Sequence, residues 1–251
     1  MVDAKYAPSR AGQPVYEEYD DDTHLAPEEL KPAPRVPITL GFDQGLGQPA
    51  CIGFQVMPNG QRRVLFEVVP GRMSPRRFAE RVKLELMDVA PNHPLAELHW
   101  CDPAGFTGAD KEDGEQAWAE IVAAELGIVI LPTETNEIEL RLTVVVDALT
   151  HFIGPGLPGF LLSRRCKMLR KGFVSHYMFE KRPDEKAQTK KPIKNLWSNP
   201  HDALQYGFLG TAGRSGAIQG NRASRDTDGR SGHNSRNAAD DCHLIEAPLS
   251  L

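Results

Sequence analysis

Residues 36–43 read VPITLGFD, an unbroken apolar run that ends on Asp43 and is followed by the glycine-rich stretch QGLGQPA. Two further apolar runs, ACIGFQVM and RRVLFEVV, come next and are separated by Pro58, Asn59 and Gly60. Short apolar runs bounded by turn residues are typical of strands, and a Pro-Asn-Gly step between two of them favours a hairpin. Residues 36–69 therefore predict three consecutive strands, the first of which ends on an acid.

Helix and strand signals alternate beyond this hairpin. Ser74 followed by Pro75 marks a helix start, with Ser74 as the N-cap and Pro75 at the first helical position. The predicted elements that follow are a helix over 74–89, a strand over 96–102, a helix over 113–126, a strand over 127–132 and helices over 136–152 and 200–209. This order predicts an α/β domain with a mixed five-stranded sheet and helices on both faces.

The two ends of the chain differ in composition from the middle. Residues 1–36 are polar and rich in proline, with eight Asp and Glu against four Lys and Arg, and we expect them to form a mostly disordered linker of the interdomain type. Residues 211–251 are dominated by glycine, serine, asparagine and arginine, which is typical of a disordered tail. The folded domain is therefore expected over residues 37–210.

Bulk properties argue against several classes of protein. The net charge of −5 does not favour a generally basic nucleic-acid coat, although a mean charge says nothing about one face. No apolar run reaches the roughly 18 residues of a membrane span, and the first ten residues lack the apolar core of a signal peptide. The four cysteines are far apart and form no CxxC pair, so neither a zinc site nor a disulfide framework is indicated. These features favour a reducing cytoplasm.

Three aspartates stand where catalytic carboxylates are commonly placed. Asp43 and Asp102 each end an apolar strand and are followed by a turn, and Asp202 lies in the first turn of the last predicted helix. If the two strands are neighbours, both acids emerge at the carboxyl edge of the sheet. Hydrolysis of a phosphodiester by a two-metal mechanism needs several carboxylates around two Mg²⁺ or Mn²⁺ ions, because these hard cations take oxygen ligands.

Position alone also fits plainer roles. An Asp at a strand end is commonly a turn or capping residue, and an Asp near a helix start complements the helix dipole. Glu67, on the third strand, is a candidate fourth carboxylate beside the metal ions or an exposed strand acid. His201 is a candidate supporting residue, ligand or general acid–base, or a surface histidine. The residues by themselves leave these alternatives open.

Three segments in order carry a resemblance to a known family: ITLGFDQGLGQPACIGFQ, HWCDPAGF and KNLWSNPHDALQYG. They resemble the three nuclease motifs of bacteriophage terminase large subunits, and the likeness covers about residues 14–210. It implies an RNase H-like fold in which Asp43, Asp102 and Asp202 are the catalytic metal ligands. The resemblance also implies cleavage of double-stranded viral DNA during genome packaging, with two Mg²⁺ or Mn²⁺ ions as cofactors. Arg141 matches a family arginine that we expect to be structural.

The same resemblance implies partners and sets limits. Terminase small subunit, portal protein and a separate ATPase motor are expected partners in the cytoplasm of a bacterial host. The sequence contains no GxxxxGK[ST] phosphate loop, so we expect the chain to lack the motor and to cut weakly in isolation. Two alternatives stay open. One is an inactive prophage remnant that binds only DNA or a packaging partner, and the other is a different RNase H-like nuclease such as a junction resolvase.

Residues 164–194 hold eleven Lys and Arg against three Asp and Glu. We expect a basic β-hairpin or loop insertion beside the active site, with residues 173–179 forming an antiparallel strand. It would grip phosphates without regard to base sequence, and its affinity would fall steeply with salt. A solvated loop is the plainer interpretation of such a charge run. The candidate DNA-binding residues are Arg164, Arg165, Lys167, Arg170, Lys171, Lys190, Lys191 and Lys194.

Overall fold

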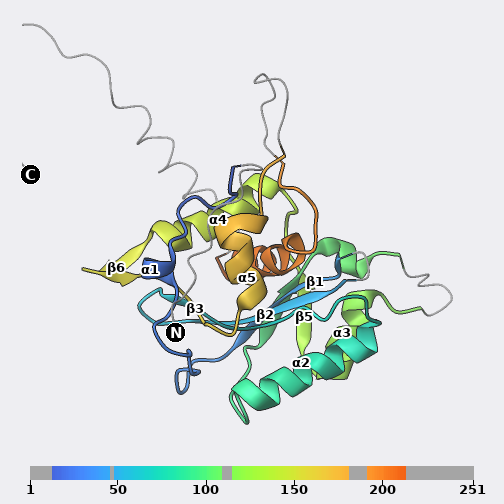
Figure 1. Cartoon of the computed structure of the whole chain (residues 1–251). Coiled ribbons are helices and arrows are strands. Elements are labelled where there is room, and N and C mark those ends of the chain that lie inside the picture. The colour runs from blue at the N-terminus through green and yellow to red at the C-terminus, as the bar shows by residue number, and fades with distance from the viewer. Residues whose placement is uncertain (1–12, 46–47, 109–114, 181–190, 213–251) are drawn as a thin grey trace, which may run out of the picture.

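The main sheet places the strand that ends on Asp43 next to its centre. The computed structural model describes residues 13–45, 48–108, 115–180 and 191–212. The sheet runs in the order β5–β4–β1–β2–β3–β8 (Figure 1). The strands β1–β2–β3 are antiparallel to one another, whereas the pairs β1–β4, β4–β5 and β3–β8 are parallel. The strand bounds are β1 Thr39–Asp43, β2 Ala50–Val56, β3 Arg62–Val68, β4 Leu98–Cys101, β5 Val129–Pro132 and β8 Phe160–Leu162.

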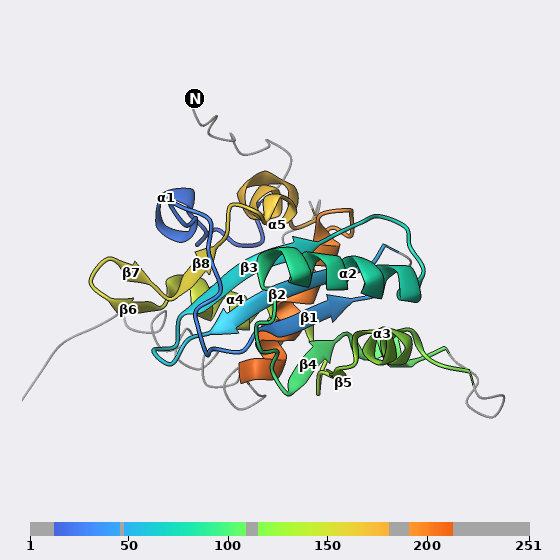
Figure 2. The same cartoon turned by 90° about the horizontal axis from the view of Figure 1, so that it is seen from below.

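Helices cover both faces of this sheet, as the sequence predicted. Helices α2 (Pro75–Val89) and α3 (Trp118–Leu126) lie on one face (Figures 1 and 2). The other face carries α4 (Ile138–Thr150), α5 (Lys167–Lys171) and the helix formed by residues 198–212. The order of elements from β1 to α4 agrees with the order read from the sequence. The mixed α/β architecture is therefore confirmed.

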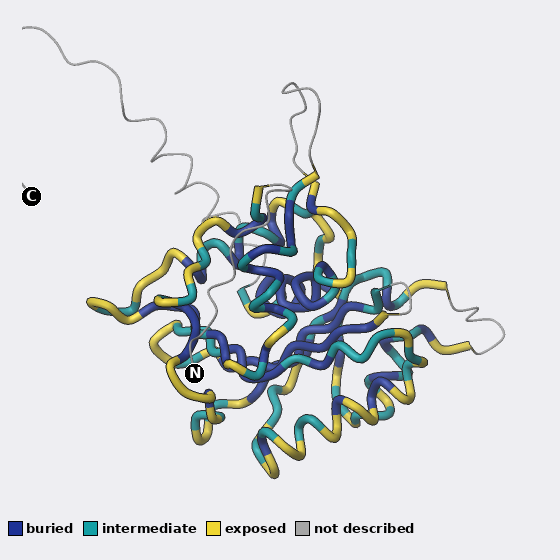
Figure 3. Tube along the Cα trace, viewed as in Figure 1, coloured by how far each residue is buried: buried dark blue, intermediate teal, exposed yellow. Residues whose placement is uncertain are grey.

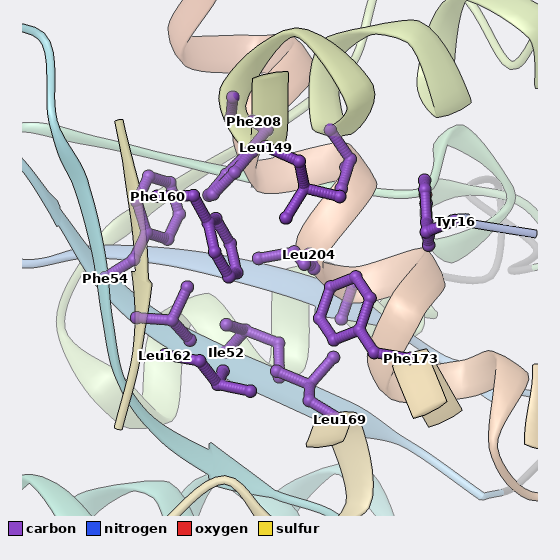
Figure 4. Close-up of a cluster of buried hydrophobic side chains, with 14 of the residues drawn as sticks. Tyr16, Ile52, Phe54, Leu149, Phe160, Leu162, Leu169, Phe173, Leu204 and Phe208 are labelled. Atoms are coloured by element: carbon purple, nitrogen blue, oxygen red, sulfur yellow. The ribbon is translucent and has the colours of Figure 1, made fainter. Parts of the chain in front are cut away.

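Alternating side chains give the sheet one core on each face. Leu40 and Phe42 of β1 pack in the cluster that contains the buried residues of α2 and α3. Ile52 and Phe54 of β2 pack in the second cluster, with Leu204 of the 198–212 helix (Figure 4). The strand backbones run as a buried layer between these helices (Figure 3). Successive side chains of a strand point to opposite faces of the sheet, and helices cover both faces here. Polar residues are therefore accommodated mainly at the ends of the strands.

The hairpin predicted at residues 58–60 joins β2 to β3. The Met57 amide donates to the Gln61 carbonyl at 2.8 Å and closes the turn. The register between the two strands shifts at Gly53 and Phe54, an irregularity that bends the strand and increases the local twist. The sequence identified the turn, but the shift depends on how side chains pack on the two faces of the sheet.

The sheet has six strands, so the prediction of five was wrong by one. The sixth strand, β8, has only three residues and follows a separate small hairpin, β6 (Phe152–Gly154) with β7 (Leu157–Pro158). Three residues are too few for a two-residue alternation to be recognised, and the neighbouring glycines and prolines read as a loop. Pairing with β3, a contact between distant parts of the chain, is what makes this segment a strand.

Residues 13–36 differ from the linker that we expected to be mostly disordered. They include the short helix α1 (Asp21–His24). Val15, Tyr16 and Leu25 are buried in the same cluster as β2 and α4, and Tyr16 lies beside Phe173 (Figure 4). The acidic and proline-rich composition therefore hides a few apolar residues that fasten the segment to the domain. Residues 1–12 and the predicted tail from 213 to 251 lie outside the described residues.

The basic segment contains a short antiparallel pairing of the predicted hairpin kind, but the predicted strand before it is absent from the described residues. Residues 167–171 form α5 and residues 172–176 continue as one turn of π-helix, η3. The predicted strand over 173–179 was therefore wrong; Phe173 and Tyr177 are buried by packing against Tyr16. A short antiparallel contact does occur between Phe179 and Pro192. Residues 181–190 lie outside the described residues. Within the described ranges, no helix combines the length and apolar character needed to cross a bilayer.

Candidate active site

Asp43 and Asp102 lie side by side at the carboxyl edge of the sheet. β1 and β4 are parallel neighbours in which Phe42 pairs with Cys101. The next residue on each strand is the aspartate, and the Asp102 amide donates to the Phe42 carbonyl at 3.3 Å. The neighbouring strands that the sequence analysis required are therefore present. This is the edge at which α/β proteins place their sites.

The helix of residues 198–212 brings Asp202 over the same edge. This helix crosses β1 at Gly41, where an added Cβ would lie 2.3 Å from the Ala203 carbonyl oxygen and 2.9 Å from the Gly207 Cα. The absence of side chains at Gly41 and Gly207 allows the two backbones to approach closely. Asp202, next to Ala203, is 1% exposed. A residue 100 positions away from Asp102 in the sequence thereby reaches the strand ends.

Asp43 shows that the three carboxylates share one electrostatic environment. Its side chain is buried, and burial raises the pKa of Asp43 to about 8, with the charges of Asp202 and Asp102 acting in the same direction. The ammonium group of Lys194 and the amide of Gly45 oppose this rise in the pKa. A carboxylate buried among like charges favours its neutral form unless a cation is bound. Among the described residues, the positive charge near Asp43 does not offset its burial and the two neighbouring carboxylates.

Two cationic side chains contact Asp202. Arg141 on α4 donates from Nη1 to Asp202 Oδ1 at 3.3 Å, and its guanidinium lies 4.7 Å from the ring centroid of Tyr206. Lys194 donates from Nζ to Asp202 Oδ2. Arg141 is 5% exposed, so it is an internal partner of the carboxylate as well as a packing residue. The sequence indicated a structural role for Arg141 and a DNA contact for Lys194, and neither role pointed to Asp202.

Asp102 is held in place from its other side. It is the N-cap of η2 (Pro103–Phe106), and its Oδ1 accepts the Ala104 amide at 3.0 Å. The same oxygen accepts Asn136 Nδ2 at 3.4 Å, and the Tyr206 hydroxyl donates to Asn136 Oδ1 at 2.7 Å. The capping role that the sequence left open is therefore real, and both of these contacts use the same carboxylate oxygen. Asn136 had no signal in the sequence, because it lies in a loop and acts through a tertiary contact.

The donor set suits a hard divalent cation. Carboxylate oxygens are the preferred protein ligands of Mg²⁺ and Mn²⁺, and burial and the charges of Asp202 and Asp102 raise the pKa of Asp43. Among the described residues, however, no three His, Cys, Asp or Glu side chains lie close enough together to form a ready metal cluster. The chemistry of the residues fits a metal ion, and their side chains would have to adjust to bind one.

Glu67 and His201 both make contacts within the fold, and the supporting roles considered for them stay predictions. Glu67 accepts the amides of Met168 and Leu169 at 2.6 and 2.8 Å, so its carboxylate caps the start of α5. His201 is fully buried and stacks on Tyr177 with ring centroids 4.6 Å apart. Burial lowers the pKa of His201 to about 3. The His201 ring is therefore neutral packing beside Asp202 and is not a surface histidine.

The candidate DNA-binding residues divide into two groups. The arginines are engaged within the protein: Arg164 donates to the Ala26 and Pro27 carbonyls, Arg165 pairs with Glu29, Glu85 and Asp88, and Arg170 pairs with Asp21. The lysines are more open. Lys167, Lys191 and Lys194 are exposed, and Lys171 is partly buried with its ammonium group 5.7 Å from the Trp197 ring. Lys190 lies outside the described residues.

Two solved structures have a similar fold. The large terminase of a thermophilic bacteriophage matches with a TM-score of 0.55 and 17% identity, over 80% of this chain and 46% of that chain. The nuclease domain of the P22 large terminase matches with a TM-score of 0.56 and 11% identity, over 80% of this chain and 93% of that domain. No protein-family model and no curated protein matches the sequence.

This chain therefore spans about half the length of the thermophilic phage terminase and nearly the whole P22 nuclease domain. At such low identities the likeness establishes the fold alone. The described residues of this chain have the mixed α/β, RNase H-like fold of the nuclease domain of phage large terminases.

Proposed function

We propose that this chain is a metal-dependent endonuclease domain that cleaves double-stranded DNA. The observation that carries the proposal is the convergence of Asp43, Asp102 and Asp202 from three elements at one edge of the sheet. Asp43 and Asp202 are buried; burial raises the pKa of Asp43, and the charges of Asp202 and Asp102 raise it further. Burying like charges together is costly for a fold. Their gathering is explained by the binding of cations.

Asp43, Asp102 and Asp202 would hold two Mg²⁺ or Mn²⁺ ions. Bound ions of this kind activate a water molecule and stabilise the leaving oxygen in phosphodiester hydrolysis. Arg141 fixes Asp202 through one oxygen, and the η2 amide of Ala104 fixes Asp102 through one oxygen. Each of these two ligands is thus oriented through one of its two carboxylate oxygens. Pre-oriented carboxylates reduce the rearrangement that metal binding needs.

The exposed lysines are the proposed DNA contacts. Lys191 and Lys194 lie in the segment that leads to the helix carrying Asp202. Lys171 lies near Trp197 of the same segment, and Lys167 is in α5 with Lys171. Ammonium groups bind phosphates as point charges and carry no sequence information. Arg164, Arg165 and Arg170 are engaged within the protein and are not among the proposed contacts. With four contacts, the affinity for duplex DNA would fall with a logarithmic salt slope of roughly −3 to −4.

The biological role proposed is cleavage of viral DNA during genome packaging. It follows from the terminase-type fold and from the three sequence motifs that the fold brings together. The two similar structures are described as a large terminase and a large terminase nuclease domain. Because this chain spans only part of a large terminase, we propose that a separate ATPase motor, a portal protein and a small subunit present the DNA to it in a bacterial host.

Nicking of supercoiled plasmid in Mn²⁺ and then in Mg²⁺ tests this function. Asp43→Asn and Asp202→Asn are expected to reduce cleavage by at least about a hundredfold, since each removes a charged metal ligand. Glu80→Gln is the matched control, because Glu80 is an exposed acid on α2, on the opposite face of the sheet. Cleavage that persists in both aspartate variants would place the activity elsewhere. A branched substrate run in parallel separates a junction resolvase from a duplex nuclease.

A further inference from the structure

The two cations on Asp202 differ in how firmly they are held. Arg141 is buried, lies over Tyr206 and belongs to α4. Lys194 has a side chain that is 69% exposed, although the carboxylate that it contacts is 1% exposed. The ammonium group therefore reaches inward from solvent to the Oδ2 atom of a buried acid. When the exposed ammonium group of Lys194 leaves, it returns to solvent, and Asp202 keeps its buried partner Arg141.

The backbone around Lys194 is fixed on its N-terminal side. The Ile193 amide donates to the Met178 carbonyl at 2.8 Å, and Pro192 pairs with Phe179. On the C-terminal side, Asn195 caps the turn that leads into the 198–212 helix, accepting the Trp197 amide at 2.9 Å. The backbone of Lys194 thus lies between two held segments, and only its side chain has to move. Its four-carbon stem gives the ammonium group a choice of positions around the site.

We propose that Lys194 is an internal counterion that occupies Asp202 Oδ2 in the metal-free protein and moves to a DNA phosphate when the substrate binds. This inference rests on the proposed function, because it takes Asp202 as a metal ligand. A divalent ion and an ammonium group compete for the same carboxylate oxygen, since the two positive charges repel each other at that distance. Transfer of Lys194 to a phosphate therefore opens Asp202 to the metal.

The consequence is a coupling between DNA binding and metal binding. Without DNA, the metal must displace Lys194 into solvent, and the apparent metal affinity is lowered. With DNA bound, a phosphate holds the ammonium group of Lys194, and Lys194 has already left Asp202 when the metal ion arrives. Linkage is reciprocal, so the metal must increase DNA affinity by the same factor by which DNA increases metal affinity. Lys194 would thereby restrict metal loading to the enzyme that already holds its substrate.

Mn²⁺ binding to the full chain, followed by electron paramagnetic resonance with and without a short DNA duplex, tests this proposal. In the unsubstituted protein the duplex is expected to tighten Mn²⁺ binding by at least about fivefold, the lower end of coupling between sites. Lys194→Gln is expected to tighten Mn²⁺ binding without DNA by a similar factor and to remove most of the effect of the duplex. Lys194→Arg retains the charge and is expected to restore the coupling.

Lys191→Gln is the matched control, because Lys191 is an exposed lysine on the same segment, whereas the described cations that pair with Asp202 are Arg141 and Lys194. It is expected to weaken DNA binding slightly while leaving Mn²⁺ affinity without DNA unchanged. Equal Mn²⁺ affinities of the unsubstituted protein and Lys194→Gln, with equal effects of the duplex, would overturn the role of Lys194 alone. Mn²⁺ binding that is absent, or that Asp43→Asn does not alter, would overturn the proposed metal site and with it this inference.

Discussion

At Asp43 a carboxylate is buried beside two others, and its pKa rises from 3.8 to about 8. A raised pKa of an acid means that the folded protein favours the protonated form. In the metal-free protein the contribution of Asp43 to stability is therefore fully present below about pH 4, and is lost as the pH rises towards 8. Residues that oppose stability in this way are common at functional sites.

We expect Asp43→Asn to make the metal-free protein more stable at pH 8 by at least about 1 kcal/mol, the equivalent of one pKa unit. The amide has nearly the same shape and carries no charge, so the loss of stability between pH 4 and pH 8 should become smaller. Urea unfolding at pH 5, 6.5 and 8 in the presence of a chelator measures this. Glu80→Gln should leave the pH dependence as it is. A less stable Asp43→Asn protein at pH 8 would contradict the assignment of charge repulsion at this position.

Asp202 illustrates a second effect at the scale of single residues. Its two oxygens contact Arg141 and Lys194, and the two contacts are unequal in burial. Removing a buried partner of a buried charge is costly, whereas the ammonium group of Lys194 returns to solvent when it leaves and Arg141 remains. The carboxylate of Asp202 is thus fixed by Arg141, and a metal ion can still take the place of Lys194. The same acid can be a stable part of the fold and an available ligand.

At the scale of elements, the site depends on how closely the 198–212 helix approaches β1. The two backbones meet at Gly41 and Gly207, where no Cβ intervenes. Asp43 is two residues beyond Gly41 on the same strand, and Asp202 precedes the contacting Ala203 on the helix. The distance between the first and third carboxylates is therefore controlled by a glycine that carries no chemistry itself.

Gly41→Ala is expected to destabilise the protein by about 1–3 kcal/mol, because the added methyl group meets helix backbone that cannot rotate away. It should also displace Asp202 from Asp43 and so weaken Mn²⁺ binding. Gly154→Ala on β6 is the control, since its Cβ would meet only a Leu157 methyl group at 3.4 Å. Unfolding midpoints and Mn²⁺ titrations of both variants are compared. A Gly41→Ala protein as stable as Gly154→Ala would show that the helix shifts without cost.

At the scale of the whole molecule, residues 13–36 join distant parts of the fold. Tyr16 packs against Phe173, and Gln205 donates to the Tyr16 hydroxyl at 3.0 Å. Arg170 on α5 pairs with Asp21 on α1 at 2.7 Å. The segment thus connects α5 with the helix that carries Asp202, three residues before Gln205. A movement of residues 13–36 would therefore displace the helix that carries Asp202, because continuous contacts join the two.

A chain that begins at residue 37 is expected to be less stable than the full chain by at least about 5 kcal/mol. It loses buried side chains that each contribute roughly 1.5–3 kcal/mol, including Val15, Tyr16, Leu25 and Leu30. A loss of this size is comparable with the whole stability of many domains. Urea unfolding of the two chains measures it. Equal midpoints would mean that the first 36 residues contribute nothing, as the composition of that segment suggested.

Much of the fold was predictable because its signals are local. Apolar runs ending on Asp43 and Asp102, the Pro-Asn-Gly turn and the Ser74-Pro75 helix start each lie within a few residues. The failures all concern segments whose conformation depends on distant partners. β8 becomes a strand through β3, and residues 172–176 are helical because Phe173 packs against Tyr16. The composition of residues 13–36 indicated disorder, but the burial of a few apolar side chains holds the segment on the domain although its acids are mostly exposed.

The sequence by itself determined the order of the elements from β1 to α4, the helices on both faces of the sheet, and the three aspartates as candidates. These properties follow from local periodicity and from motif spacing. Only the tertiary structure decided that the aspartates share one electrostatic environment, that Arg141 and Lys194 contact Asp202, and that Glu67 caps α5. Such contacts join residues far apart in the chain, and their energies depend on burial and distance, which exist only once the helices have packed on the sheet.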